Sequence, residues 1–120
     1  MPEREAPMNA MAAKLARGEV AWGVQLAYAD AGVVEALARG WDWVWIDAQH
    51  GQHEDATILR AVQLCRTAGA AALVRVAGHS PDAVGLALDT GLDALMVPMV
   101  NSADEARRLA RACAFPPSGE

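Results

Sequence analysis

Short apolar runs alternate along this chain with longer segments whose apolar residues recur every three or four positions. The short runs are rich in β-branched, leucine and tryptophan residues, and at this length they predict buried strands. The longer segments have the spacing of amphipathic helices. The expected strands cover residues 20–26, 43–47, 71–76 and 93–97. The expected helices cover residues 9–17, 30–38, 55–68, 80–90 and 102–113.

The ends of these helices carry residues that favour such positions. Asn9 and Asp30 can act as N-caps, and Ser80 precedes a proline, which fits the first helical position. Ser102 and Glu105 have the spacing of a capping box, in which each side chain bonds the backbone N–H of the other residue. Glycines follow the first four helices and are expected to end them.

Helical spacing also predicts which side of each helix faces the core. The expected inward residues are Val34, Leu37 and Ala38 in the second helix, Ile58, Leu59, Val62 and Cys65 in the third, and Leu109, Ala110 and Cys113 in the last. The arginines of the last helix, at 107, 108 and 111, are expected to face solvent.

The order of elements predicts an α/β fold made of four strand-then-helix units. Apolar strands separated by amphipathic helices indicate a parallel sheet with right-handed crossovers. Both edges of such a sheet would be apolar here, and open apolar edges invite pairing with another chain. We therefore expect residues 9–120 to form the amino-terminal half of a (β/α)8 TIM barrel, a fold of about 250 residues. Residues 1–8 are expected to be a flexible tail.

Composition narrows the possible partners and compartment. The chain has 120 residues, of which 53% are hydrophobic and 21% charged, with a net charge of −5. This balance predicts a packed globular protein that binds neither nucleic acid nor membranes. The amino terminus has no apolar signal segment. Cys65 and Cys113 form no C-x-x-C motif, so two thiols in the reducing cytoplasm are expected, with a disulfide between them as the alternative.

The stretch WDWVWIDAQHG, residues 41–51, brings two chemical groups to the end of a buried strand. Asp47 ends the strand, His50 follows in the turn, and Gly51 lets the backbone bend. A carboxylate at this spacing can accept from one imidazole nitrogen and leave the other to exchange a proton with a substrate. Polar groups at strand ends of α/β folds are often functional. The alternative is a solvated loop before a helix.

Arg75 is the second candidate. A guanidinium near the end of a buried strand is costly unless it has an anionic partner or faces a polar opening. The carboxyl ends of barrel strands converge, so Arg75 is expected near Asp47. The alternative is a purely structural ion pair with Asp47 or another acid.

Other polar residues allow weaker readings. Asp47, His50, His53 and Glu54 have a spacing that zinc accepts, although such a loop pattern is unspecific. His79 follows the third strand and is expected to be a loop residue. Gln25, near the end of the first strand, and Asn101, after the fourth, could supply hydrogen bonds, with a structural role as the default. The chain contains no G-x-G-x-x-G, P-loop or G-x-S-x-G motif, which removes support for nucleotide binding and serine hydrolysis.

These residues together resemble a known family. The stretch from Trp22 to Glu120 resembles the amino-terminal half of the HpcH/HpaI aldolases, metal-dependent (class II) pyruvate aldolases typified by 4-hydroxy-2-oxoheptanedioate aldolase. The resemblance lies in four segments that keep the family's order and spacing: GWDWVWIDAQHG, ALVRV, GLDALMVPMVNSADEARRLARAC and FPPSGE. It covers nearly the whole chain but only about half of the family's barrel.

The resemblance implies a carbon–carbon lyase that cleaves a 2-keto-4-hydroxy acid to pyruvate and an aldehyde. It implies that His50 is the acid/base, acting through a water, that Asp47 orients it, and that Arg75 stabilises the enolate oxygen. A divalent metal, Mg²⁺ or Mn²⁺, would bind the pyruvate enolate. No residue of this chain inherits the metal-ligand role, since the family's metal-binding Glu and Asp follow Glu120.

Two alternatives remain beside this reading. One is a non-catalytic half-barrel that associates with itself or another chain through its open edges; for the enzyme too we expect a homo-oligomer. The other keeps the fold but changes the substrate to an acyl-CoA ester, as in the related citrate-lyase-like enzymes. One departure from the family bears on substrate choice: Gln49 stands where the family often has Glu.

Overall fold

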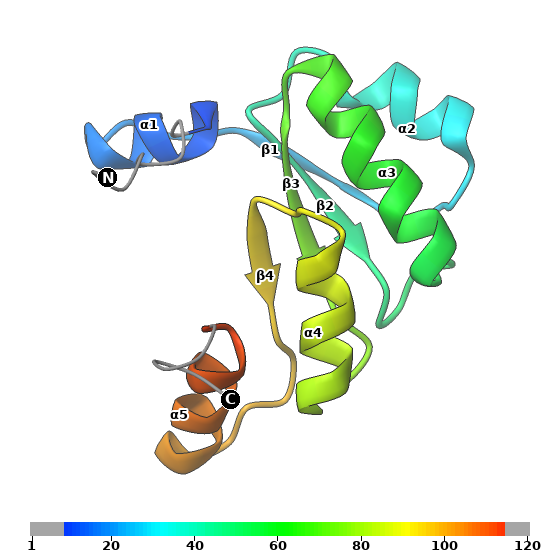
Figure 1. The fold of residues 1–120 in the computed structure, drawn as a ribbon. Helices are drawn as coiled ribbons and strands as arrows, with labels where there is room; N and C mark the ends of the chain where they lie inside the picture. The colour runs from blue at the N-terminus through cyan, green and yellow to red at the C-terminus, as the bar shows by residue number, and fades with distance from the viewer. Residues whose placement is uncertain (1–8, 115–120) are drawn as a thin grey trace, which may run out of the picture.

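The computed structural model describes residues 9–114, and it contains one parallel sheet of four strands in the order β1-β2-β3-β4. Each strand is followed by a helix (Figure 1). This arrangement confirms the expected α/β fold of four strand-then-helix units. The predicted tail at 1–8 and the final segment at 115–120 lie outside the described residues.

Three of the four strands are shorter than predicted, and the second has the predicted bounds. The strands span β1 Gly23–Leu26, β2 Trp43–Asp47, β3 Ala71–Arg75 and β4 Ala94–Met96. The first strand was expected to begin at Val20, but Gly23 pairs with Trp43, the first residue of β2. Trp22, just before Gly23, is hydrogen-bonded to Asp42, which precedes β2, so the pairing of the two strands begins at Gly23 and Trp43.

Four helices follow their predicted N-caps, and the third begins at Asp55 as expected, with Glu54 as its N-cap. The helices span α1 Ala10–Ala16, α2 Ala31–Ala38, α3 Asp55–Ala68, α4 Pro81–Asp89 and α5 Ala103–Ala112. The side chains of Asn9, Asp30 and Ser80 each accept a backbone N–H three residues on. The glycines at 18, 40, 69 and 91 adopt positive φ angles, which end the preceding helices without the penalty that a Cβ would add.

The capping box of α5 is only half formed. Ser102 Oγ accepts the Glu105 N–H at 3.2 Å, as the spacing predicts. The Glu105 carboxylate instead accepts the N–H of Asn101 at 2.8 Å, one residue before the expected donor.

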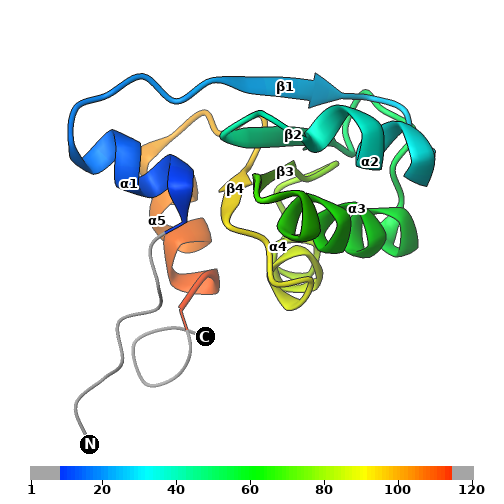
Figure 2. The ribbon, with the colours of Figure 1, turned by 90° about the horizontal axis from the view of Figure 1, so that it is seen from above.

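Helices α2, α3 and α4 lie side by side against the sheet (Figures 1 and 2). The core lies between them and the strand residues that face them, among which Val44, Ile46 and Val74 are 0% exposed. The alternate residues Trp43, Trp45 and Leu73 point to the other face and are only half-buried. No helix within residues 9–114 is both long and apolar enough to cross a membrane.

Several predicted core positions lie outside the core. Leu37 is 46% exposed and Leu59 is 43% exposed, so both predictions were wrong. The buried stripes are narrower, with Ile58, Val62 and Cys65 on α3 and Val34 and Ala38 on α2. In α5 only Leu109 is buried, and Ala110 and Cys113 are exposed. Helix α5 packs mainly on α4 and follows the edge strand, so its contact face is small.

Candidate functional site

The candidate site lies at the carboxyl end of β2 and β3. Asp47 is the last residue of β2, and it stands in register with Arg75, the last residue of β3. The Arg75 guanidinium donates from Nε to Asp47 Oδ1 at 3.0 Å and from Nη2 to Asp47 Oδ2 at 2.5 Å. The structure therefore brings together two of the three predicted site residues as a two-point ion pair, the geometry in which arginine holds carboxylates most firmly.

The Asp47 carboxylate accepts three further hydrogen bonds. Gln25 Nε2 donates to Oδ2 at 3.0 Å, and the backbone N–H groups of Gln49 and His50 donate to Oδ1 at 3.0 and 3.1 Å. The side chain of Asp47 is 1% exposed, so these donors replace its water. A buried carboxylate with this many donors is stable in its ionised form.

The electrostatics of the pair follow from these contacts. The hydrogen bonds from the Arg75 guanidinium hold the pKa of the Asp47 carboxyl well below its usual range, although burial alone would raise that pKa. The backbone donors at His50 and Gln49 lower it further. In turn Asp47 raises the pKa of Arg75. Both groups therefore remain charged at neutral pH.

The loop that carries His50 packs closely against the backbone of Asp47 and Ala27. A Cβ on Gly51 would collide with the carbonyl oxygen of Asp47 and lie 2.9 Å from that of Ala27. Only glycine lets the loop pass so close to the strand end, and the N–H of Gln52 then donates to the Ala27 carbonyl at 2.8 Å. Glycine is therefore required at the predicted turn because the backbone of Gly51 lies very close to the backbone of Asp47 and Ala27.

The backbone of His50 contacts Asp47, but the expected hydrogen bond between the Asp47 carboxylate and the His50 imidazole is not formed. Asp47 bonds the backbone N–H of His50, while the His50 side chain is exposed and makes no hydrogen bond to another described residue. The reason is that the Asp47 oxygens are already occupied by Arg75, Gln25 and two backbone donors. Asp47 thus holds the backbone of the His50 loop, and the exposed imidazole has no hydrogen-bond partner among the described residues.

Two contacts of the site were not predicted from the sequence. Arg75 Cζ lies 4.7 Å from the centroid of the Trp45 ring, so the guanidinium stacks on an indole face. Gln25 was expected to be structural and able to supply a hydrogen bond, and its Nε2 donates to Asp47 Oδ2, a partner that the sequence did not indicate. The alternation Trp43, Trp45, Asp47 places Trp45 and Asp47 on the same face of β2, and this signal could have indicated the stacking.

The remaining candidates do not join this cluster. His53 is 7% exposed, and both its ring nitrogens are buried without a described partner; burial lowers its pKa. His79 is exposed after β3, and Asn101 donates to the carbonyl of Met99. Within residues 9–114 no three His, Cys, Asp or Glu side chains gather to hold a metal ion. The weak zinc reading of the loop therefore finds no support in the geometry.

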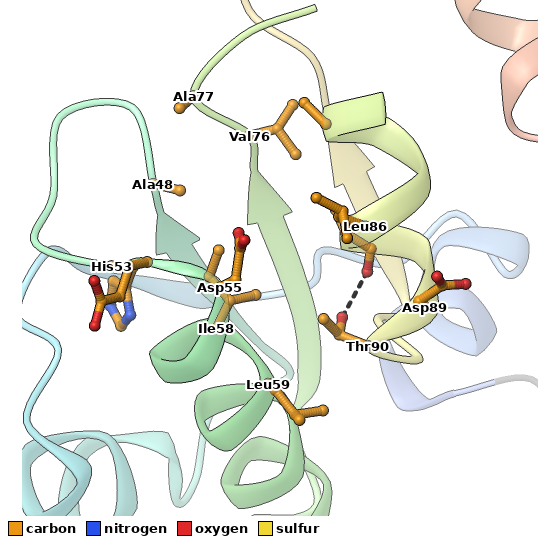
Figure 3. A pocket seen from close by; sticks show the side chains of 13 residues that line it. Ala48, His53, Asp55, Ile58, Leu59, Val76, Ala77, Leu86, Asp89 and Thr90 are labelled. Carbon is orange, nitrogen blue, oxygen red and sulfur yellow. Dashed lines mark hydrogen bonds between the residues drawn. The ribbon is translucent and has the colours of Figure 1, made fainter. Parts of the chain in front are cut away.

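Two cavities lie outside the cluster. One of about 460 Å³ lies between α3 and α4, with Ile58 and Leu59 on one side and Leu86 on the other (Figure 3). The second, of about 720 Å³, lies beside His79 and Arg108. Asp47, His50 and Arg75 line neither cavity. The candidate site, at the carboxyl ends of β2 and β3, is therefore separate from these two cavities.

The sequence and the fold both match known proteins. The model of the HpcH/HpaI aldolase/citrate lyase family matches residues 24–120. A 4-hydroxy-2-oxovalerate aldolase of Novosphingobium aromaticivorans is 39% identical, over 97% of this chain and 45% of that protein. A hydroxypyruvate/pyruvate aldolase of Roseovarius nubinhibens is 36% identical, over 95% of this chain and 45% of that protein.

A solved structure shows the same arrangement of elements. The HpcH/HpaI aldolase of Desulfitobacterium hafniense superimposes with a TM-score of 0.79 at 30% identity, over 90% of this chain and 42% of that one. The chain thus spans less than half the length of the relatives it matches. Its four strand-then-helix units correspond to part of their TIM-barrel-like fold.

Proposed function

This chain belongs to the HpcH/HpaI aldolase/citrate lyase family, and on that premise we propose that it forms part of the active site of a carbon–carbon lyase. The proposed reaction is the reversible aldol cleavage of a 2-keto-4-hydroxy acid to pyruvate and an aldehyde. The aldolase names of the relatives support this choice over cleavage of acyl-CoA esters.

The observation that carries the proposal is the fixed guanidinium of Arg75 beside an exposed imidazole. In aldol cleavage the bond between C3 and C4 breaks, and its electron pair passes to the keto oxygen as an enolate. A cation that is already held in place stabilises the charge that develops there. Asp47 holds Arg75 through Nε and Nη2, which leaves Nη1 without a partner among residues 9–114. We assign Nη1 to the keto-acid oxygen.

His50 is the proposed acid/base. Cleavage requires that the C4 hydroxyl lose its proton as the aldehyde forms, and condensation returns it. The exposed imidazole can take that proton through a water, because neither ring nitrogen is bonded to another described residue. Asp47 holds the backbone N–H of His50 and so limits where the imidazole can move.

A divalent metal, Mg²⁺ or Mn²⁺, is proposed for the whole enzyme on the family relationship alone. Within residues 9–114 no three His, Cys, Asp or Glu side chains gather, and the Asp47 oxygens already accept hydrogen bonds from Gln25 and Arg75. We therefore propose that its ligands are carboxylates outside this sequence, which spans 45% of its aldolase relatives.

The test is steady-state kinetics of retro-aldol cleavage with the product of the complete native gene. We expect His50→Ala to lower kcat by about 10²–10⁴-fold, the usual worth of a general acid/base. The matched control is His79→Ala, which removes an exposed imidazole that follows β3. Unchanged kcat in His50→Ala would remove His50 from this role, and an equal loss in both variants would point to folding instead.

Self-association is a second proposal, supported by the sheet edges. Within residues 9–114, β1 and β4 each pair with a strand on one side only. We propose that these edges bind further strands and that the protein is a homo-oligomer, whether or not it is catalytic. Sedimentation of the purified chain tests this, because a stable monomer would argue against it.

We place the protein in the cytoplasm, which its two free thiols support.

A further inference from the structure

Gln25 contacts the site from a third strand. It lies on β1 in register with Trp45, and its Nε2 donates to Asp47 Oδ2 at 3.0 Å. The same oxygen accepts Arg75 Nη2 from β3. Oδ2 is therefore held between donors from the two strands that flank β2, whereas the Oδ1 donors are Arg75 Nε and the backbone of the following loop.

The charge of Asp47 determines which way the Gln25 amide faces. An ionised carboxylate can only accept hydrogen bonds, so the amide must turn its NH₂ group toward Oδ2. Its Oε1 then faces away from the carboxylate. Gln25 is exposed, so no close packing requires this orientation, and the hydrogen bond itself is the reason for it.

We propose that Gln25 is a positioning residue that acts through Asp47 on the orientation of the Arg75 guanidinium. Arg75 is held on one edge by Asp47 and on one face by Trp45. A carboxylate that loses its Gln25 donor can rotate about the bond to its Cβ. The guanidinium then follows the carboxylate and leaves the plane in which it stacks on Trp45. The catalytic consequence rests on the proposed aldol function, whereas the structural one does not.

The structural part is tested by NMR of the purified chain. We expect Gln25→Met, which keeps the length but removes the donor, to raise the pKa read from the Asp47 carboxyl carbon and to speed hydrogen exchange of the Arg75 Nε–H. Gln25→Glu should raise that pKa more, because like charges would meet at the contact. Gln63→Met is the matched control, since Gln63 is an exposed glutamine on α3. Unchanged Asp47 and Arg75 signals in both Gln25 variants would overturn the proposal.

The catalytic part is tested by kinetics with the product of the complete native gene. Gln25→Met should lower kcat by about tenfold, the worth of a hydrogen bond to a charged group, with little change in KM. A higher KM at constant kcat would instead indicate direct contact with substrate and would overturn the positioning role. If the unmodified enzyme has no aldolase activity, the proposed function fails, while the NMR result still decides whether Gln25 positions Arg75.

Discussion

The two ends of strand β2 carry the same kind of ion pair but leave different groups free. At the amino end, Asp42 pairs with Lys14 of α1 and accepts the N–H of Trp22. At the carboxyl end, Asp47 pairs with Arg75 and accepts the N–H groups of its own loop. The side chains of the first pair are 17% and 34% exposed, and those of the second 1% and 18%.

The difference lies in what each pair holds in place. Asp42 and Lys14 join a helix to the start of the sheet, and Asn9 of the same helix bonds Asp93, so this end is a set of structural links. Asp47 instead fixes a guanidinium and a loop with an exposed imidazole. In barrels of this type the amino ends of the strands serve stability and the carboxyl ends carry chemistry. An ion pair by itself therefore does not identify a site.

The strongest test of this comparison replaces each aspartate with asparagine. Asp47→Asn should lower kcat of retro-aldol cleavage by about 10²-fold, because a misplaced catalytic group loses that much. The new NH₂ group would meet the donors of Arg75 and Gln25, so the guanidinium would move. Asp42→Asn is the matched control and should leave kcat unchanged. Equal kcat values for the two variants would contradict the assignment of a catalytic role to the carboxyl end of β2 and a structural role to its amino end.

A glycine substitution tests how closely the loop of His50 depends on the strand end. Gly51→Ala should lower the free energy of unfolding by about 1–3 kcal/mol, since its Cβ would collide with backbone that cannot yield. Gly85→Ala on α4 is the control. Its Cβ meets nothing within 4 Å, and alanine should raise helix stability by about 0.5–1 kcal/mol. Urea unfolding measures both, and a neutral Gly51→Ala would contradict the close approach.

The pH dependence of stability should be the smallest effect. Arg75 lowers the pKa of Asp47 in the folded state from its ordinary 3.8, so the unfolded chain binds the proton more readily. The stabilisation from Asp47 is therefore complete above the ordinary pKa and is lost as the pH falls below it toward the folded value. Asp47→Asn should flatten this acid limb of the unfolding free energy. A limb that stays equally steep in the variant would assign it to other carboxylates.

Part of the candidate site could be predicted from the chain. Asp47, His50 and Arg75 each follow an apolar run, and parallel strands bring such positions to one edge, so the Asp47–Arg75 pair was foreseeable. The sequence could not show that Asp47 bonds the backbone of His50 instead of its ring. That choice depends on how many donors compete for the two carboxylate oxygens. The burial of His53 could not be predicted either, because a solvated residue just before a helix would occupy the same position in the sequence.

Local patterns by themselves determined the elements, the caps at Asn9, Asp30 and Ser80, and the parallel α/β arrangement. These features depend on neighbours a few residues away and on the burial of apolar runs, and both can be read along the chain. Tertiary structure alone decided that Gln25 meets Asp47, that Arg75 stacks on Trp45, and that Leu37, Leu59, Ala110 and Cys113 stay outside the core. These contacts depend on strand register and on which helix faces are covered, and such pairings join residues that are far apart in the sequence.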